Sequence, residues 1–331
     1  MSKFILGVDG GGTKSHVAVF DDKGNCKTAF ATGPLNHEAM KGSYDELEMH
    51  LGEMIARTLK DIGATVSDIA FAVFGLAGVD TDAQQVLISD MVSKIGIKEH
   101  IMCNDAFLGV PAGCPDCVGV CAINGTGFKL AAVDHSDNAV QICGLGSFTD
   151  DLGGGSWYGY RAIGTVYNEL YKLGQKTIMR EMLFDMLDIS RREDYMEVFT
   201  EKLYGGKLDH IALNSTPFNA AALGDTVAIK ILDESAAQYA GGIARLIMDM
   251  DFPVDKPVHV TLAGSVFVKQ KVRVLQELIE KRVSEALGGR PMIYNRLDTS
   301  PVVGAAMWAA QKAGFNIDIS SVKSSLKEAG L

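Results

Sequence analysis

The chain has 331 residues, enough for two domains of ordinary size, and its 47% hydrophobic and 22% charged residues are typical of a globular protein. The formal charge of −10 argues against a nucleic-acid-binding surface. No stretch approaches the roughly 20 apolar residues of a membrane span, and the first apolar run stops at Val8 and meets Asp9, unlike a signal peptide. We therefore expect a cytoplasmic protein with reduced thiols, and neither a membrane nor a nucleic acid among its partners.

The N-terminus predicts a β-hairpin with a glycine-rich turn. An apolar run from Phe4 ends at Asp9, and an alternating run follows from His16 to Phe20. Between them lie three glycines, whose backbone N–H groups are free to face an anion, then a hydroxyl donor and a cation. Asp9 is suited to hold a metal through water. Phosphate and magnesium together indicate a nucleotide, bound by Gly10, Gly11, Gly12, Thr13 and Lys14.

Two other interpretations of this hairpin stay open. A Walker P-loop requires the pattern GxxxxGK[ST] followed by a helix. Gly7 and Gly12 have that spacing, but Thr13 stands where the lysine must be, and the next run alternates like a strand. An ordinary tight hairpin is the simpler alternative, although two glycines would suffice for it. We favour phosphate binding.

The first third of the chain predicts the order β-β-β-α-β-α-β. After the hairpin we expect a strand, a helix, a buried strand, a second helix and a short strand, over residues 26–31, 44–62, 69–75, 82–95 and 100–103. The pattern then restarts. A strand over 117–123 ends in Asn124-Gly125-Thr126-Gly127, and strands follow over 129–133 and 140–143. Two halves that each open with a glycine hairpin indicate a duplicated fold with a nucleotide between them.

The remainder predicts mostly helix. We expect helices over 157–176 and on to 204, helical periodicity over 220–250 interrupted at 224–225 and 241–242, a strand over 258–262, a helix over 269–287, a strand over 291–297 and a last helix over 303–313. This order predicts an N-terminal domain, 1–116, and a C-terminal domain, 117–331, with a helical insertion at about 157–250. The last helix is free to pack back on the N-terminal domain.

Three of the six cysteines lie close together, at Cys114, Cys117 and Cys121. Cys114 and Cys117 form a CxxC pair, which suits redox chemistry or a metal. However, no second CxxC or histidine pair completes a zinc site, and Cys121 lies in an apolar strand pattern. We favour plain loop thiols for the pair.

Polar residues and glycines gather where the predicted strands end. In α/β sheets, ligands bind outside the carboxyl ends of the strands. One cleft is therefore expected to contain Asp9, Gly75, Asn104-Asp105, Gly125-Thr126 and Gly264.

Five segments, in this order, resemble the BadF/BadG/BcrA/BcrD ATPase family, and within it the N-acetylglucosamine kinase-like branch of the ASKHA superfamily of actin-like ATPases and sugar kinases. They are the first phosphate loop, the GLAGVD motif, the NDA motif, the second phosphate loop and the terminal connecting segment, at residues 7–14, 75–80, 104–106, 125–127 and 301–306. The resemblance spans nearly the whole chain. It implies an α/β, duplicated ribonuclease H-like (actin-like ATPase) fold of two domains with a nucleotide cleft between them, the use of ATP and Mg²⁺, and a homodimer.

By the same resemblance, Asp105 is the catalytic base, which accepts the proton of an attacking sugar hydroxyl. The alternative role for Asp105 is to cap the helix that begins at Ala106. Asn104 and the Asn36-His37 pair contact the sugar, and the alternative for that pair is a polar surface turn.

Small residues after a strand let a purine approach the backbone, although a plain strand-to-helix turn needs them too. The adenosine loop is assigned to Ala263, Gly264 and Ser265.

The segment from Gly144 to Trp157 departs from the family, which reads roughly GWG, then GDEGSG and an aromatic. In an alignment without gaps, Gly144 matches the first glycine of the family pattern, and Asp151 aligns with the aspartate that binds the sugar in the family. Leu145 replaces the family tryptophan, and Leu152 replaces the glutamate. Losing an aromatic and a carboxylate alters the shape and charge of the pocket. The change fits a substrate with a bulkier or more anionic substituent, such as N-acetylmuramate.

The resemblance implies an ATP-dependent kinase that phosphorylates an N-acetylhexosamine, either N-acetylglucosamine or an N-acetylmuramate-like amino sugar, at the 6-hydroxyl. One alternative is an ATPase activator of a 2-hydroxyacyl-CoA dehydratase or benzoyl-CoA reductase-type system, which holds an iron–sulfur cluster between subunits. The Cys114/Cys117 pair suggests that alternative. The other alternative is a non-catalytic nucleotide or sugar sensor.

Overall fold

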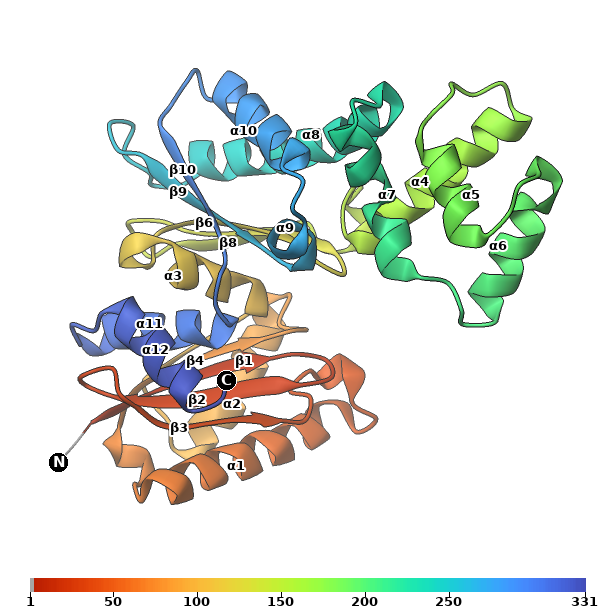
Figure 1. Ribbon diagram of the computed structural model, residues 1–331. Coiled ribbons are helices and arrows are strands. Elements are labelled where there is room, and N and C mark those ends of the chain that lie inside the picture. Colours follow the sequence, from red (N-terminus) through yellow and green to blue (C-terminus); the bar gives the residue numbers. More distant parts are fainter. Residues whose placement is uncertain (1–2) are drawn as a thin grey trace.

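The computed structural model describes residues 3–331, and its framework is two mixed five-stranded sheets (Figure 1). The first has the order β3-β2-β1-β4-β5 and contains β1 (Phe4–Gly10), β2 (Ser15–Asp21), β3 (Cys26–Thr32), β4 (Ile69–Leu76) and β5 (His100–Cys103). The second has the order β10-β9-β6-β7-β8 and contains β6 (Gly119–Asn124), β7 (Phe128–Val133), β8 (Ala139–Ile142), β9 (Val258–Ala263) and β10 (Met292–Arg296).

The two sheets have the same topology. In each, the first three strands in the chain pair antiparallel, and the fourth and fifth extend the other edge in parallel. The sequence-based prediction of a duplicated α/β fold is therefore confirmed. In both halves a glycine hairpin joins the first two strands, so the hairpins occupy equivalent places.

Helices cover both faces of the first sheet, which explains why β1 is buried along almost its whole length. On one side lie α1 (Ser43–Ile62) and α2 (Asp82–Ile95) (Figure 1). The apolar residues of α1 recur at helical spacing and face the core, as the sequence predicts. On the other side α11 (Pro301–Ala313) lies against β1 and β4.

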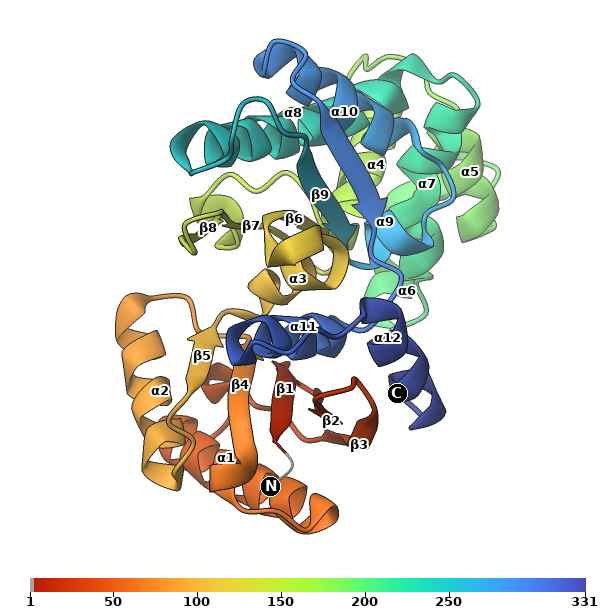
Figure 2. The same cartoon turned by 90° about the vertical axis from the view of Figure 1, so that its left-hand side faces the viewer.

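The second sheet is covered by α8 (Thr226–Asp249) and α10 (Val274–Ala286) on its outer face and by α3 (Gly109–Gly113) on its inner face (Figure 1). The inner helices α3 and α11 meet between the two sheets (Figure 2). Glycine is required there, because a Cβ on Gly304 would lie 1.9 Å from the Leu108 carbonyl oxygen. One apolar cluster thus connects the two halves.

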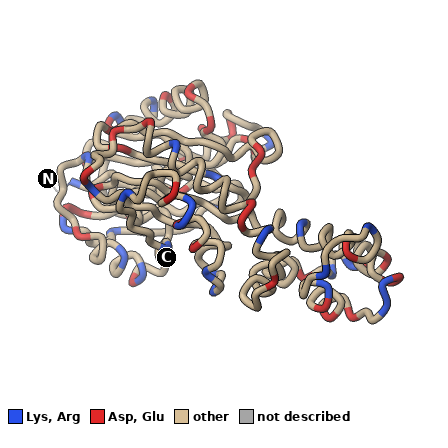
Figure 3. Tube along the Cα trace, turned by 90° about the horizontal axis from the view of Figure 1, so that it is seen from above, with Lys and Arg blue, Asp and Glu red and all other residues tan. Residues whose placement is uncertain are grey.

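A helical lobe extends from the second half, away from both sheets (Figure 3). It consists of α4 (Gly155–Tyr171), α5 (Met179–Leu187), α6 (Tyr195–Tyr204) and α7 (His210–Ala222). The remaining helices are α9 (Ser265–Lys269) and α12 (Ile319–Glu328). Short 3₁₀ turns lie at His37–Ala39, Val66–Asp68, Asp105–Leu108, Pro115–Cys117, Gly146–Phe148 and Arg192–Asp194. Within residues 3–331, no helix is both long and apolar enough to cross a membrane.

Several sequence-based boundaries are wrong. The strand expected from Cys117 begins at Gly119, because Cys117 adopts a left-handed φ of 57° in a 3₁₀ turn. The helix expected over 157–176 ends at Tyr171. The helix expected over 269–287 begins at Val274, after the short α9 has ended at Lys269. The helix expected to be the last is followed by α12, which lies against β3.

The long helix α8 is not interrupted at Gly241-Gly242, contrary to the sequence-based prediction. Gly242 faces β7, and a Cβ there would lie 2.3 Å from Leu130 Cδ1. Gly242 therefore lets the helix approach the sheet instead of ending it, whereas Gly241 faces open space. Packing against the sheet offsets the low helix propensity of the pair.

Candidate active site

The first glycine hairpin is closed by a backbone hydrogen bond from Gly11 N–H to the Lys14 carbonyl at 3.2 Å. A Cβ on Gly11 would lie 2.7 Å from that carbonyl oxygen, and one on Gly10 would lie 2.4 Å from Leu76 Cδ2. Both positions therefore require glycine. Thr13 and Lys14 are exposed at the tip of the turn, where they are accessible to an anionic ligand.

Two other loops pack on this hairpin. Ala77 N–H donates to the Gly10 carbonyl at 2.7 Å, and Leu35 N–H donates to the Gly11 carbonyl at 3.2 Å. Gly78 has φ +84°, and a Cβ on it would lie 2.4 Å from Asn36 Oδ1. The predicted substrate residue Asn36 therefore lies between the first phosphate loop and the GLAGVD segment.

His37 is buried beneath this loop rather than in a surface turn. Its ring stacks on Tyr44 with a centroid separation of 4.3 Å, and its Nε2 lies 3.5 Å from Gln84 Nε2. These contacts fix the position of Asn36, whose Oδ1 accepts the Glu38 N–H at 2.9 Å. The His37 ring thus positions the turn that carries Asn36.

The second glycine hairpin brings together three segments that are distant in the sequence. Gly155 N–H, at the start of α4, donates to the Gly125 carbonyl at 2.8 Å. A Cβ on Gly154 would lie 2.5 Å from the Thr126 carbonyl oxygen, and one on Gly264 would lie 2.5 Å from the Asn124 carbonyl oxygen. The expected adenosine loop, Ala263 to Ser265, therefore borders the Gly125-Thr126-Gly127 turn.

Asn124 holds this second hairpin in place, a role that sequence reasoning missed. Its side chain is buried, with Oδ1 accepting the Gly154 N–H and Nδ2 donating to Tyr158 Oη, both at 2.8 Å. Tyr158 Oη also lies 2.7 Å from Ser235 Oγ in α8. The signal available in the sequence was that Asn124 stands directly before the Gly125-Thr126-Gly127 turn.

Asp105 begins a 3₁₀ turn at the end of β5, and the preceding Asn104 caps that turn by accepting the Ala106 N–H on Oδ1 at 3.0 Å. Burial raises the pKa of Asp105 to about 6. The charge of Lys129 opposes this shift, whereas the nearby carboxylates of Asp9 and Asp80 add to it. A carboxyl group with this pKa is ionised near neutral pH and is basic enough to accept a proton.

Asp80 is the centre of a polar network beside Asp105. Its Oδ1 accepts hydrogen bonds from Asn104 Nδ2 at 3.0 Å, from Lys129 Nζ at 3.1 Å and from Gln141 Nε2 at 3.1 Å. Lys129 and Gln141 belong to the second sheet, so the network joins the two halves of the molecule. Asp80 is the last residue of the GLAGVD motif, but no sequence pattern indicated Lys129 or Gln141.

Asp151 lies in the loop after β8 and keeps that loop folded. Its Oδ2 accepts the N–H groups of Gly144 at 2.9 Å and Gly146 at 2.8 Å, whereas its Oδ1 is buried and has no partner among residues 3–331. A Cβ on Gly144 would lie 2.4 Å from Lys129 Cε, so the loop abuts the Asp80 network. Leu145 is 61% exposed.

Asp9 lies at the end of β1, opposite His16, with 3.7 Å between its Oδ2 and His16 Nδ1. No group of three or more potential metal-ligating side chains occurs in the described part of the chain. Mg²⁺ is usually held by one or two carboxylates, several waters and substrate phosphates rather than by a protein cage. One carboxylate close to Asp105 and to the first hairpin therefore fits such an ion.

Comparison with known proteins decides the family. The model of the BadF/BadG/BcrA/BcrD ATPase family matches residues 6–309, nearly the whole chain. This chain belongs to that family.

Two curated relatives of this BadF/BadG/BcrA/BcrD family member are sugar kinases by name. One is the N-acetylmuramic acid/N-acetylglucosamine kinase of Clostridium acetobutylicum, which is 26% identical over 80% of this chain and 85% of its own length. The other is the N-acetyl-D-glucosamine kinase of Dictyostelium discoideum, which is 24% identical over 93% of this chain and 98% of its own length. A ROK family glucokinase from Streptomyces griseus, solved with glucose and AMPPNP, has the same fold. Its TM-score is 0.53 at 18% identity, over 94% of this chain and 100% of the glucokinase.

In this family member the CxxC pair is buried rather than displayed on a loop. Cys114 Sγ lies 3.2 Å from Thr261 Oγ1, at the seam between α3 and the second sheet. Burial raises the pKa of Cys114 to about 11 and that of Cys117 to about 12. Both thiols are therefore protonated near neutral pH.

Proposed function

We propose that this chain is an ATP-dependent kinase that phosphorylates an N-acetylhexosamine, either N-acetylglucosamine or an N-acetylmuramate-like amino sugar, at the 6-hydroxyl. The observation that carries the proposal is Asp105, a carboxyl group with its pKa raised to about 6 beside the Asp80 network. The names of the two curated relatives support the class of sugar.

In the proposed reaction, Asp105 accepts the proton of the sugar 6-hydroxyl as its oxygen attacks the γ-phosphorus of ATP. The bond from that phosphorus to the β–γ bridging oxygen breaks, and ADP departs. The phosphates lie against the backbone N–H groups of Gly10 to Lys14 and of Gly125 to Gly127, and the Lys14 ammonium adds positive charge. Ala263, Gly264 and Ser265 leave room for adenosine.

Asp9 and the nucleotide phosphates would hold Mg²⁺. When bound, that ion neutralises charge on the phosphates. The carboxylate of Asp9 also disfavours a second negative charge on Asp105, which keeps that base protonatable near neutral pH.

The sugar is proposed to contact Asn36, His37, Asn104, Gly144, Leu145 and Asp151. The unpartnered Asp151 Oδ1 supports this assignment, since a sugar hydroxyl would satisfy a buried acceptor. We further propose that domains 1–116 and 117–331 close over the substrates, which excludes water and limits ATP hydrolysis. A cytoplasmic homodimer is part of the same proposal.

A coupled ADP-release assay tests this function. N-acetylglucosamine, N-acetylmuramate, N-acetylmannosamine, glucosamine and glucose are compared, and the phosphorylated carbon is assigned by NMR. We expect an N-acetylated sugar to give the highest kcat/KM and its 6-phosphate as product. Binding of ATP and sugar without phosphoryl transfer would instead identify a sensor, and purified protein with visible iron–sulfur absorbance would identify an activator ATPase.

A further inference from the structure

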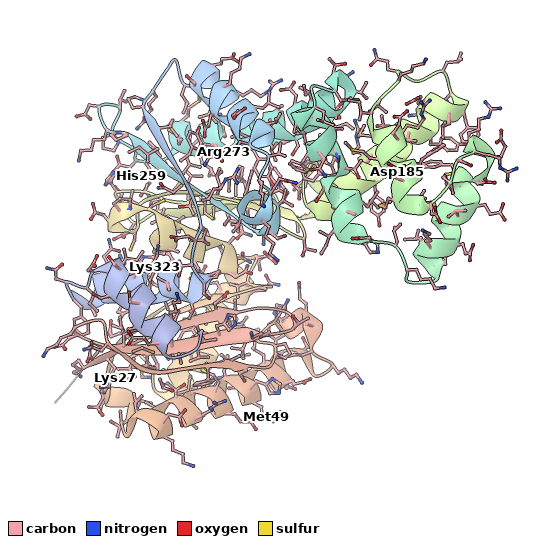
Figure 4. The ribbon with its side chains drawn as sticks, in the orientation of Figure 1. Lys27, Met49, Asp185, His259, Arg273 and Lys323 are labelled. Carbon is pink, nitrogen blue, oxygen red and sulfur yellow. The ribbon has the colours of Figure 1, made fainter. Side chains whose placement is uncertain are left out.

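A cavity of about 1010 Å³ lies between the two halves and shares no lining residue with the glycine hairpins or the Asp80 network. Its walls come from α3 and the following turn, the end of β10, the start of α10, and helices α11 and α12. Figure 4 labels two lining residues on opposite sides, Arg273 on the upper half and Lys323 on the lower half. The cavity is large enough for a small metabolite.

Both chain connections between the two halves line this cavity. The first runs from β5 to β6 and contributes residues 111–117. The second runs from β10 to α11 and contributes Leu297 and Asp298, which follow the lining residues 294–296 at the end of β10. Asn295 Nδ2 donates to the Gly113 carbonyl at 3.3 Å, which links the end of β10, just before the second connection, to α3 in the first. A change in the angle between the halves must move these connections, so it must also change the shape of the cavity.

Two arginines at one end of the cavity have no carboxylate partner within residues 3–331. Arg296 donates only to neutral acceptors, the Gln276 side chain at 2.9 Å and the Gln270 carbonyl at 2.7 Å. Burial lowers the pKa of Arg296, and the charge of the exposed Arg273 lowers it further. The nearby Arg282, in contrast, is paired with Asp233 at 2.6 Å.

Three aspartates line the cavity, and two of them, Asp298 and Asp318, are engaged, whereas Asp116 lies in the turn after α3 with the other lining residues of the first connection. Asp298 pairs with Lys323 at 2.7 Å, and Asp318 accepts the Ser320 hydroxyl at 2.6 Å. Glu280, which faces the arginine end from α10, accepts Gln276 Nε2 at 2.7 Å. Two like charges held close together are relieved best by an anion that carries more than one negative charge, and a phosphate monoester carries about −1.5 to −2 at pH 7.

We propose that this cavity binds a small phosphate monoester, with its phosphate on Arg273 and Arg296, and that its occupancy changes the affinity of the distant nucleotide site. Leu297, Phe315 and Ile317 give the organic part of the ligand an apolar wall. Because both connections line the site, the ligand has different contacts when the halves open or close, which is the requirement for coupling. The inference does not depend on which sugar the chain phosphorylates.

Isothermal titration of the full chain tests the site with three probes: inorganic phosphate, AMP and N-acetylglucosamine 6-phosphate. Each titration is run with the nucleotide cleft saturated by a non-hydrolysable ATP analogue, so that phosphate binding in the cleft is suppressed. The dissociation constant of the analogue is measured in a separate titration, with and without the monoester. We expect a monoester to bind with one site per chain, more tightly than inorganic phosphate, and to change the dissociation constant of the ATP analogue at least threefold.

Arg273→Ala is the main variant, since an exposed side chain is replaced without loss of a hydrogen bond. Lys271→Ala is its matched control, because it removes one exposed positive charge two residues away that does not line the cavity. We expect at least tenfold weaker monoester binding in Arg273→Ala and an unchanged value in Lys271→Ala. Arg296→Gln is expected to weaken binding similarly, with its fold checked by thermal unfolding.

Three results would overturn the proposal. They are the absence of saturable binding for all three probes, equal losses in Arg273→Ala and Lys271→Ala, and monoester binding that leaves the dissociation constant of the ATP analogue unchanged. Each is independent of kinase activity, so the failure of the proposed function and the failure of this inference are distinguishable.

Discussion

Lys129 Nζ lies 3.1 Å from Asp80 Oδ1, and this ion pair joins the second sheet to the first beside the candidate base. Lys129 also donates to Asn104 Oδ1 at 3.2 Å, next to Asp105 in the chain. Both side chains of the pair are largely shielded from solvent, so salt screens the pair less than a surface bridge. Lys129 therefore has two effects: it links the halves and it lowers the pKa of Asp105.

Replacing Lys129 by methionine is expected to move the acidic limb of the kcat/KM profile upward. Lys129 lowers the pKa of Asp105, so its removal raises that pKa further above about 6. The base is then protonated over more of the neutral range, and activity falls most below pH 7. Lys27→Met is the control, because Lys27 lies at the far edge of the first sheet (Figure 4). An acidic limb that stays in place in Lys129→Met would contradict this role.

The sequence predicted both glycine hairpins and the duplicated order of strands, because these features depend on short-range patterns. It missed the Asp80 network, because Lys129 and Gln141 are 49 and 61 residues from Asp80 in the chain and meet it only when the halves assemble. It also missed α12, although Ile319, Val322 and Leu326 recur at helical spacing and pack on the apolar cluster. This stripe is short, and serine and charged residues fill the rest of the helix.

The Gly241-Gly242 pair shows that helix propensity alone does not determine where a helix ends. Glycine lowers helix stability by about 1 kcal/mol in isolation, and so the pair predicts a break. In the structure the lack of a side chain at Gly242 lets α8 lie directly on Leu130 and Ile142, and tertiary packing outweighs the local cost. Whether a glycine breaks a helix thus depends on the residues that pack against it, and the sequence alone does not show these residues.

Replacing Asp105 by asparagine tests the assignment of the base. The amide keeps the size of the side chain but has no basic oxygen, so turnover is expected to fall by about 10²- to 10⁴-fold. ATP binding, measured by titration, is expected to be unchanged, because the hairpins that contact the phosphates are untouched. Turnover equal to that of the natural chain would remove Asp105 from the mechanism.

The same substitution is expected to stabilise the fold at high pH. The pKa of Asp105 is about 6 in the folded chain against an ordinary value of 3.8, so the folded state binds the extra proton. Its contribution to stability is fully present below pH 3.8 and is lost as the pH rises through about 6. The difference in unfolding midpoint between Asp105→Asn and the natural chain should therefore grow from pH 4 to pH 7.5 and then level off.

The exposed Asp255 provides the control for this pH dependence. Asp255→Asn removes an equal charge without removing a buried carboxyl group, and its midpoint should follow that of the natural chain at every pH. A constant offset in Asp105→Asn from pH 4 to pH 7.5 would mean that burial of this carboxyl has no energetic cost.

Gly78→Ala is expected to damage sugar recognition more than nucleotide binding. The new Cβ would lie 2.4 Å from Asn36 Oδ1, so the Asn36 side chain must leave its present position. We expect the KM for the preferred sugar to rise about tenfold, equivalent to roughly 1.4 kcal/mol, with the KM for ATP nearly unchanged. Gly63→Ala is a close control, since Gly63 has φ +63° and no atom within 4 Å of the added Cβ. Both variants carry the same kind of backbone strain and should lose similar stability, but only Gly78→Ala should raise the KM for sugar. Equal KM values for sugar in the two variants would show that Asn36 does not contact the substrate.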